Sequence, residues 1–532
     1  MHRSLKTHQT THLVALFTAY LAALYCLKAK FEPLASWRSF MTTATGIFGV
    51  FLPPVLLLLG VYGFLLGTAR AKWRVAVRAW LLAKLYELPK RLVGLNVGLL
   101  GLSALLFAGG ILLYEIGPVP TRVRNGEVLT LNRKSKPYYV DDTIEVEEGG
   151  RIEIGPGVRV LFAPAGGILV KGVIKATGTQ SEPIYLSSRN DEIRWRNLTL
   201  WGPGTNGSRL QYLTISSGGG MLTINIDRQP HYLFDDDPNA VRQGGGILLV
   251  QSSPTIDRCE IRKCQAKFGG GLAIRNGSNP KVSNTTIVEN TALDSTLSCG
   301  GGIFIVSANP EISFCDISEN IAKARSSAGG GIYCGIDARP RIIKNRIVGN
   351  FVQGDGGGIY SYGSSDSDVP FEIQNNEIRG NIAQQFGGGI CVDYGSSPRI
   401  IGNTIIENRT TGFVNIYEKT MTSSGGGIFI GGDPQNPKLS RPKIINNSIL
   451  RNIASPVDGT IEHLNGTGGG IACFNKTEVV LSNNQIAHNH ARIGGGIYHP
   501  NDCVILNTQG LEVDSNIPDD IHHADTSFLE GR

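Results

Sequence analysis

Residues 300–320 read GGGIFIVSANPEISFCDISEN, and this stretch contains the pattern that decides the fold. Three glycines precede an aliphatic residue, and Pro310, Ile312, Ile317 and Asn320 then follow at fixed offsets. The same order of residue types recurs along most of the chain, which indicates a repeat architecture. The glycine triplet is always followed by Ile or Leu, and it ends at Gly246, Gly271, Gly302, Gly331, Gly358, Gly389, Gly427, Gly470 and Gly496.

A second motif follows most triplets and has the form Pro-x-Ile-x-x-Asn-x-Ile-x-x-Asn. Residues 340–350, 398–408 and 442–452 show it in full. Short strands with period-two alternation, separated by turns at constant phase, are typical of a solenoid of stacked coils. We predict an all-β parallel β-helix of about twelve coils, each about 30 residues long. The first and third residues after each triplet should point inward and stack at about 4.8 Å.

Asparagines at two constant phases should form two ladders inside this solenoid. An inward amide at a sharp bend can hydrogen-bond to the equivalent amide one coil above and below. Glycines at the corners permit positive φ and a close approach between coils. The first predicted ladder comprises Asn345, Asn376, Asn403, Asn447 and Asn484, and the second comprises Asn290, Asn320, Asn350, Asn381, Asn408, Asn452 and Asn489.

These motifs resemble the repeats of the right-handed parallel β-helix (pectin-lyase-like) superfamily. They are similar in particular to the GGA(I/L/V) and FxxN repeats of polymorphic outer-membrane proteins, and residues 138–188 resemble the opening coils of many bacterial members. The resemblance extends over residues 138–510 and implies a right-handed parallel β-helix. Because the superfamily contains lyases, hydrolases, epimerases and non-catalytic adhesins, the resemblance implies no single activity.

The amino-terminal part of the chain has a different composition, and three apolar runs indicate membrane-spanning helices. The runs are residues 11–27, 44–69 and 92–114. The second and third are long enough to cross a hydrocarbon core of about 30 Å, and the first is at the short end. No small-residue cleavage site follows the first run, so we interpret it as a retained helix. Residues 1–117 are therefore predicted to be a membrane anchor with three transmembrane α-helices.

The segment between the second and third runs predicts the orientation of the anchor. Residues 70–91 contain seven Lys or Arg residues and one acidic residue, so the positive-inside rule places them in the cytoplasm. Residues 118–137 would be a linker, residues 138–510 the extracytoplasmic β-helix, and residues 511–532 a C-terminal cap or tail. We expect a multi-pass protein of the cytoplasmic (inner) membrane, with the β-helix on the periplasmic or extracellular side.

The partners expected from these features are the lipid bilayer and a further macromolecule. Gly63 and Gly67, and Gly94 and Gly98, have the spacing that allows close contact between helices, within the anchor or with a larger membrane protein complex. The chain would be an accessory subunit in the latter case. The formal net charge of +6 is small for this length and gives no support to nucleic-acid binding.

The outward positions after the triplets bear on whether the protein is an enzyme. Glycoside chemistry needs two acids within about 5–9.5 Å, but only Asp393 is acidic among the second and fourth residues after the triplets. The sequence therefore favours a non-catalytic scaffold or binding module for a partner protein or a surface polysaccharide. A polysaccharide-active lyase, hydrolase or epimerase remains the alternative, in which Asp366, Asp368, Asp393 or Asp433 would converge in a groove.

Aromatic residues at the same outward positions suggest a binding surface, because a row of exposed rings suits sugar rings or a protein partner. The alternative is that loops 409–424 and 453–467 cover them. A column of cations, Lys281, Arg341, Arg399 and Lys443, could meet an acidic glycan or be a solvated face. The predicted aromatic stripe comprises Phe304, Tyr333, Tyr360, Tyr362, Phe429 and Tyr498.

We expect no cofactor and no metal site. Asp235, Asp236 and Asp237 form the nearest approach to a calcium site, but a solvated acidic loop is the simpler interpretation. His488, His490 and His499 are interpreted as a chance cluster. We interpret the eight cysteines after the anchor as buried thiols. Cys259 and Cys264 should lie on either side of one corner of a coil, so they are the pair to check for a disulfide.

Overall fold

The computed structural model describes residues 119–190, 192–223, 241–363, 371–415, 420–432, 439–454 and 465–524. The chain divides into two units, Met1–Gly117 and Pro118–Arg532, and every described residue belongs to the second unit. The three apolar runs and the basic loop 70–91 lie outside the described residues. Among the residues that are described, no helix is long and apolar enough to cross a membrane.

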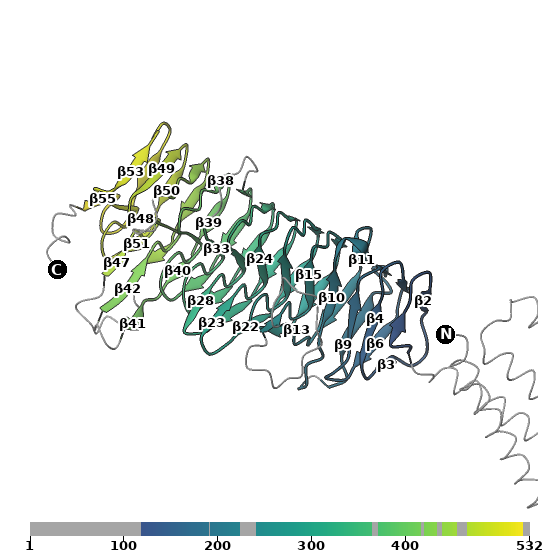
Figure 1. Cartoon of the computed structure of the whole chain (residues 1–532). Helices are drawn as coiled ribbons and strands as arrows, with labels where there is room; N and C mark the ends of the chain where they lie inside the picture. Colours follow the sequence, from purple (N-terminus) through teal and green to yellow (C-terminus); the bar gives the residue numbers. More distant parts are fainter. Residues whose placement is uncertain are drawn as a thin grey trace, which may run out of the picture. The chain divides into compact units, whose positions relative to one another are not determined.

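The second unit is a parallel β-helix in which each coil contributes one strand to each of three long sheets (Figure 1). Successive strands of one sheet pair in parallel with equivalent residues side by side, as Ile303 does with Ile332 and Ile332 with Ile359. A strand can pair in parallel with its equivalent in the next coil only after the chain has completed one full turn. The parallel register therefore shows the stacked coils that the repeat predicted.

The first sheet contains the strands that follow the glycine triplets and carries the candidate site. Its order is β1 (Arg122–Val123), β4 (Thr143–Val146), β7 (Gly167–Val170), β10 (Leu198–Trp201), β15 (Ile247–Val250), β19 (Leu272–Arg275), β24 (Ile303–Val306), β29 (Ile332–Cys334), β33 (Ile359–Ser361), β37 (Ile390–Val392), β43 (Ile428–Gly431), β48 (Ile471–Phe474), β52 (Ile497–Pro500) and β55 (Ile521–Ala524).

The second and third sheets follow the first in every coil. The second sheet contains β2 (Val128–Leu131), β5 (Arg151–Ile154), β8 (Val173–Thr177), β11 (Arg209–Gln211), β16 (Thr255–Asp257), β20 (Lys281–Ser283), β25 (Glu311–Ser313), β30 (Arg341–Ile343), β34 (Glu372–Gln374), β38 (Arg399–Ile401), β44 (Lys443–Ile445), β49 (Thr477–Ser482) and β53 (Cys503–Leu506). The third contains β3 (Tyr138–Val140), β6 (Arg159–Phe162), β9 (Ile184–Ser188), β12 (Leu213–Ser216), β17 (Glu260–Arg262), β21 (Thr286–Val288), β26 (Asp316–Ser318), β31 (Arg346–Val348), β35 (Glu377–Arg379), β39 (Thr404–Ile406), β45 (Ser448–Leu450), β50 (Gln485–Ala487) and β54 (Glu512–Asp514).

Short strands lead from the third sheet back to the next glycine triplet. The fourth sheet contains β18 (Gln265–Ala266), β22 (Thr291–Leu293), β27 (Ile321–Lys323), β32 (Phe351–Val352), β36 (Ile382–Ala383), β40 (Arg409–Thr410), β46 (Ile453–Ala454) and β51 (His490–Ala491). Three smaller sheets contain β13 (Met221–Thr223) with β14 (Val241–Gln243), β23 (Leu297–Cys299) with β28 (Ser326–Ala328), and β41 (Phe413–Asn415) with β42 (Thr420–Ser424) and β47 (Asn465–Thr467). One turn of 3-10 helix, Pro203–Thr205 (η2), is also described.

The interior of the solenoid is built from the aliphatic columns that the triplets predicted. The first and third residues after a triplet, such as Ile303 and Ile305, have no exposed surface. Burying such side chains away from water is the main favourable term in folding, and here every coil repeats it in the same place. The columns therefore fix the register between neighbouring coils.

Both asparagine ladders are present, and each amide is bonded on two sides. In the first ladder, Asn376 Nδ2 donates to Asn403 Oδ1 at 2.9 Å and to the Ile342 carbonyl at 2.8 Å. Asn376 Oδ1 accepts from the backbone N and from Nδ2 of Asn345, at 2.8 and 3.0 Å. The second ladder continues past the predicted residues, because Asn489 Nδ2 donates to Asn516 Oδ1 at 3.0 Å.

The boundaries of the β-helix are wider than the sequence indicated. Strands β1 and β2 lie in residues 118–137, which were expected to be a linker, and they pair with β4 and β5. Strands β54 and β55 lie in the expected cap or tail, 511–532, and pair with β50 and β52. These coils lack the glycine triplet, so the repeat gave no signal for them, and the first sheet has 14 strands rather than about twelve.

Candidate functional site

The outer face of the first sheet carries a column of aromatic rings. The second residues after successive triplets pair in register, so Phe304 lies beside Tyr333, and Tyr333 beside Tyr360. Their ring centroids are 5.2 and 5.4 Å apart, and the ring planes differ by 4° and 5°. These distances are within the range of favourable aromatic contacts. Registered stacking of coils has therefore produced an ordered aromatic surface.

A second group of rings continues the column toward the carboxy terminus. Phe429 stacks against Phe474 with centroids 5.6 Å apart, and Phe474 lies 5.2 Å from Tyr498. Tyr498 in turn stacks against His522 at 5.8 Å. Phe474 is the fourth residue after its triplet and was not among the predicted binding residues. It occupies the place that Ala472, the second residue of that coil, leaves open.

Residues that immediately precede the glycine triplets cover part of this column. We call them the covering row. The ring of Phe268 stacks on Phe304 at 5.1 Å, and that of Phe386 on Phe429 at 4.4 Å. Successive members are connected by parallel bridges or strand pairing, except for Asp355 and Phe386, which are connected by the hydrogen bond from the Phe386 backbone N to Asp355 Oδ1. The covering row comprises Gln243, Phe268, Cys299, Ala328, Asp355, Phe386, Ser424, Thr467 and Ile493.

The covering row decides between the two alternatives for the aromatic stripe, because it covers part of the stripe. Phe304, Tyr360 and Phe429 are each only 5% exposed. The backbone at the triplets explains this, because the first glycine has a positive φ, as at Gly356 with +72°, and packs directly over the second residue of the strand. The loops 409–424 and 453–467 contribute Ser424 and Thr467 to the same row.

Other rings on this face keep contact with solvent. Tyr333, Tyr362 and Tyr498 are partly exposed. Tyr394, which follows the first sheet in the coil of β37, is 42% exposed and lies 4.8 Å from the ring of Tyr362. These four tyrosine rings are therefore only partly covered, unlike Phe304, Tyr360 and Phe429. We call these four tyrosines the tyrosine band.

The aromatic column is interrupted where Cys391 takes the second position, between Tyr360 and Phe429. Two carboxylates lie around this gap. Asp355 belongs to the covering row, and Asp393 is the fourth residue after its triplet. They come from adjacent coils, so the register of the sheet brings them to one place.

Asp355 is held in an environment that favours its protonated form. Burial, together with the negative charge of Asp393, raises the pKa of Asp355 from 3.8 to about 7. The Phe386 backbone N donates to Asp355 Oδ1 at 3.1 Å, which offsets part of this effect. Burial and the neighbouring Cys391, Asp393 and Asp355 also raise the pKa of Tyr360 well above its usual value.

Asp393 is positioned by the end of its strand and by a glycine in the next coil. The Tyr394 backbone N donates to Asp393 Oδ1 at 2.9 Å. A Cβ atom at Gly431 would lie 2.6 Å from the same oxygen, so a larger residue there would shift this carboxylate. An enzyme that needs both a general acid and an ionised carboxylate usually has two neighbouring carboxyl groups. One of them keeps its proton near neutral pH and the other does not.

The structure brings together one predicted acid and one that the sequence analysis missed. Asp393 was predicted, whereas Asp355 was not, because only the residues after the triplets were taken as outward. The sequence did contain a signal for Asp355. This residue directly precedes a glycine triplet, at Gly356, whereas the residues that precede the neighbouring triplets are apolar or carry a hydroxyl group. The other predicted acids, Asp366, Asp368 and Asp433, lie outside the described residues.

The column of cations on the second sheet is not a positive stripe. Glu311 and Glu372 alternate with the predicted cations in the register of the sheet. Arg341 lies 2.6 Å from Glu311 and 3.2 Å from Glu372, and Arg399 lies 3.8 Å from Glu372. Most of this face is therefore charge-balanced, which favours the interpretation as a solvated face.

No three His, Cys, Asp or Glu side chains converge as a metal site within the ranges that the structure describes. Asp235, Asp236 and Asp237 lie outside those ranges. His499 contacts His523, with the two Nδ1 atoms 3.3 Å apart, while His488 and His490 are exposed on the other side of the coil. His488, His490 and His499, which lie close together in the sequence, therefore do not converge in the structure.

The eight cysteines of the second unit are all buried and free. The sulfur of Cys259 donates to the Asp257 carbonyl at 3.4 Å, and that of Cys264 to the Arg262 carbonyl at 3.2 Å. Burial raises the pKa of both thiols to about 12. Each is therefore engaged with its own backbone, as expected of thiols that fill a core.

Residues 204–372 match the protein family described as "Right handed beta helix region". The match and the parallel sheets agree that the second unit is a right-handed parallel β-helix. A stretch of 79 residues is 38% identical to "Protein bark beetle" of Drosophila melanogaster. The stretch covers 14% of this chain and only 2% of that protein.

Three solved structures align with large parts of this chain at low sequence identity. The periplasmic alginate epimerase AlgG aligns with 12% identity and a TM-score of 0.35, over 69% of this chain and 87% of that one. The Dettilon tailspike protein aligns with 15% identity and a TM-score of 0.32, over 75% and 62%. The tailspike gp49 of Acinetobacter baumannii bacteriophage Fri1, a capsular polysaccharide depolymerase, aligns with 8% identity and a TM-score of 0.32, over 74% and 65%.

Proposed function

We propose that the chain is a membrane-anchored β-helix that binds a polysaccharide along the outer face of its first sheet, on the extracytoplasmic side of the cytoplasmic membrane. The observation that carries the proposal is the tyrosine band. Its rings are partly exposed and held by the rigid scaffold of stacked coils. Such side chains offer a flat apolar surface with a polar hydroxyl group at its edge, which suits the two faces of a sugar ring.

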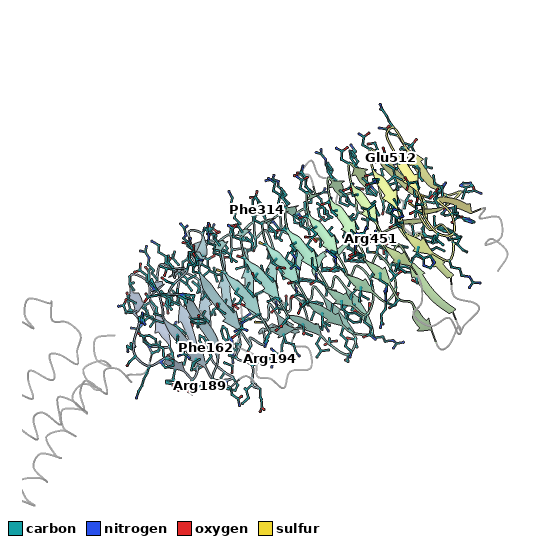
Figure 2. All side chains as sticks on the ribbon, turned by 180° about the vertical axis from the view of Figure 1, so that it is seen from behind. Phe162, Arg189, Arg194, Phe314, Arg451 and Glu512 are labelled. Carbon is teal, nitrogen blue, oxygen red and sulfur yellow. The ribbon has the colours of Figure 1, made fainter. Side chains whose placement is uncertain are left out.

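The other described faces of the solenoid offer less to a ligand. The second sheet pairs Arg341 with Glu311, and the third pairs Arg346 with Asp316 at 2.8 Å. Exposed ion pairs of this kind leave little net charge to attract a partner. Phe314 is a large exposed ring at the corner between these sheets (Figure 2), but its neighbour is Lys344, 5.4 Å from the ring centroid, rather than another aromatic side chain.

The membrane anchor is part of the proposal and is supported by the sequence of residues 1–117. Three apolar runs with a basic loop between the second and third place the following residues outside the cytoplasm. The full chain should therefore sediment with membranes at high salt and at alkaline pH. Protease added to intact spheroplasts should degrade the second unit; its survival there would contradict the orientation.

Polysaccharide binding can be measured on the full chain in detergent micelles, against a set of neutral and acidic bacterial polysaccharides. We expect binding of at least one of them, and a loss of affinity of about tenfold or more in the double variant Tyr362→Ala, Tyr394→Ala, because removing an aromatic anchor costs more than about 1 kcal/mol. Phe314→Ala is the matched control and should bind normally. Absence of binding, or an equal loss in Phe314→Ala, would contradict the proposal.

A polysaccharide-active enzyme is the second candidate, and the pair Asp355 and Asp393 is the observation that favours it. Asp355 would act as the general acid, and Asp393 as the ionised carboxylate or base. Cleavage or epimerisation of a bound polysaccharide should then fall above about pH 7 as Asp355 loses its proton. The variants Asp355→Asn and Asp393→Asn should bind without turnover. Binding by the native chain with no change in the polysaccharide would exclude this candidate.

A further inference from the structure

Two thiols at the carboxy-terminal end of the solenoid are in contact with each other. Cys473 is the third residue after its triplet, in β48, and has no exposed surface. Cys503 begins β53 and is 4% exposed. The two side chains lie in the same core cluster, where each perturbs the pKa of the other, and Thr477 Oγ1 donates to Cys503 Sγ at 3.1 Å.

The path of the chain explains why these two residues meet. Asn475 and Lys476 both have positive φ, 59° and 53°, and turn the chain sharply between Cys473 and Thr477. Thr477 pairs in register with Cys503 of the next coil. Cys503 therefore lies above Thr477 and diagonally across the corner from Cys473. The contact connects two successive coils.

The position of Cys503 also gives it a route to reagents. Among the residues that the structure describes, β53 is the last strand of the second sheet, and no described strand pairs with its outer edge. Its neighbours Val504 and Leu506 are 47% and 43% exposed. By contrast, Cys334 lies at the same phase as Cys473 but in the middle of the first sheet, between β24 and β33.

We propose that Cys473 and Cys503 are a redox-active pair that closes to a disulfide and joins the last coils of the solenoid when the protein meets a disulfide donor. The thiolate of Cys503 attacks one sulfur of the donor and releases one donor thiolate, which leaves a mixed disulfide. The thiolate of Cys473 then displaces the second donor thiol. The net reaction oxidises two protein thiols, reduces one donor disulfide to two thiols, and moves both protons to the released thiols or to solvent.

The attacking role falls to Cys503 for two reasons. It is in the last described strand of its sheet, and the neighbouring Cys473 and the hydrogen bond from Thr477 Oγ1 lower its pKa, although burial opposes this. Disulfide exchange proceeds through the thiolate. The donor class is a small disulfide such as oxidised glutathione, or an exposed protein disulfide of a thiol oxidoreductase.

The test uses the full chain in detergent micelles, held in oxidised or reduced glutathione, then denatured with an alkylating agent and digested with trypsin. Cys473 and Cys503 fall in separate tryptic peptides, residues 452–476 and 493–532, and each is the only cysteine of its peptide. In oxidised glutathione we expect these two peptides to be linked and to lose alkylation completely. The other six cysteines of the unit should remain alkylated.

Variants separate this pair from non-specific oxidation. Cys473→Ser should abolish the link and leave glutathione attached to Cys503, whereas Cys334→Ala should leave the link unchanged. In the native chain, oxidation should also slow proteolysis of the terminal coils, and this protection should be lost in Cys503→Ser. The proposal is overturned if both thiols of the folded native chain stay alkylated in oxidised glutathione, or if they link to other cysteines instead.

Discussion

At the scale of single residues, the ladder asparagines show how a buried polar group can stabilise an apolar interior. Each amide offers two donors and two acceptor sites, and Asn376 uses all four, with partners in the coils on both sides. A buried amide that lost these partners would cost free energy rather than contribute it. The ladders therefore enforce the register between neighbouring coils.

Replacing one ladder residue should be costly, and its sequence neighbour provides the control. Asn376→Ala leaves the backbone N of Asn345 without its acceptor and removes one donor each from Asn403 Oδ1 and the Ile342 carbonyl, so we expect the free energy of unfolding to fall by about 2–4 kcal/mol. Asn375 is exposed and has a φ of 54°, which glycine tolerates, so Asn375→Gly should be nearly neutral. Denaturant melts of the two variants measure the difference, and equal stabilities would mean that the ladder is not a structural element.

Asp355 gives a pH-dependent prediction whose sign follows from its raised pKa. Between pH 4 and 7 the unfolded chain releases this proton while the folded chain retains it, so the folded state loses stability as the pH rises. One pKa unit corresponds to about 1.4 kcal/mol, and the shift from 3.8 to about 7 sets an upper limit of about 4 kcal/mol. The partly exposed side chain should show less than this limit.

The variant Asp355→Asn should therefore melt at a higher temperature than the native chain at pH 8 and at a similar temperature at pH 4. Asp514→Asn, at an exposed carboxylate on the last strand of the third sheet, is the control and should follow the native chain at both values. Thermal melts across the pH range provide the measurement. If the variant is less stable than the native chain at pH 8, ionisation of Asp355 does not destabilise the folded state and the prediction is wrong.

At the scale of elements, the glycine triplets determine how closely the coils approach. A Cβ at Gly357, the middle glycine, would lie 2.3 Å from the Gly388 carbonyl oxygen and 2.8 Å from backbone atoms of Ile382. Both contacts are with backbone, which cannot move aside without separating two coils. The middle glycine is thus required for packing rather than for an unusual φ.

Gly357→Ala should accordingly destabilise the protein by about 1–3 kcal/mol or more, since overpacking forces a backbone shift. Gly380→Ala is the control, because Gly380 has a φ of +62° but no atom within 4 Å of its missing Cβ, and its cost should be limited to local strain of about 1 kcal/mol. The two melting temperatures give the comparison. A larger loss at Gly380 than at Gly357 would reject close packing as the role of the triplet.

The sequence predicted the interior of these elements because the same residue type returns in every coil. Ile303, Ile332 and Ile359 share one phase, and so do the ladder asparagines. The covering row has no such regularity: its members include Phe268, Asp355 and Ser424. A position whose chemistry changes from coil to coil produces no periodic signal. The sequence therefore offered burial of the aromatic stripe only as an alternative, through loops 409–424 and 453–467, and gave no sign that Asp355 approaches Asp393.

At the scale of the whole molecule, stacking converts a local repeat into long continuous faces with different chemistry. Ion pairs such as Arg346 with Asp316 occupy the faces away from the first sheet, whereas the first sheet bears rings and the carboxyl pair. The outermost coils, whose strands β1 and β55 lie outside residues 138–510, were recognised only through strand pairing. A ligand as long as a polysaccharide would contact several coils at once, which is what a registered aromatic face allows.

Hydroxyl-radical footprinting of the full chain, with and without a saturating bound polysaccharide, tests most directly whether the outer face of the first sheet is the ligand surface. The account predicts that oxidation of Tyr362 and Tyr394 falls on binding, while oxidation of Phe314, exposed at the corner between the second and third sheets, stays the same. Protection of Phe314 with unchanged oxidation of the two tyrosines would contradict it.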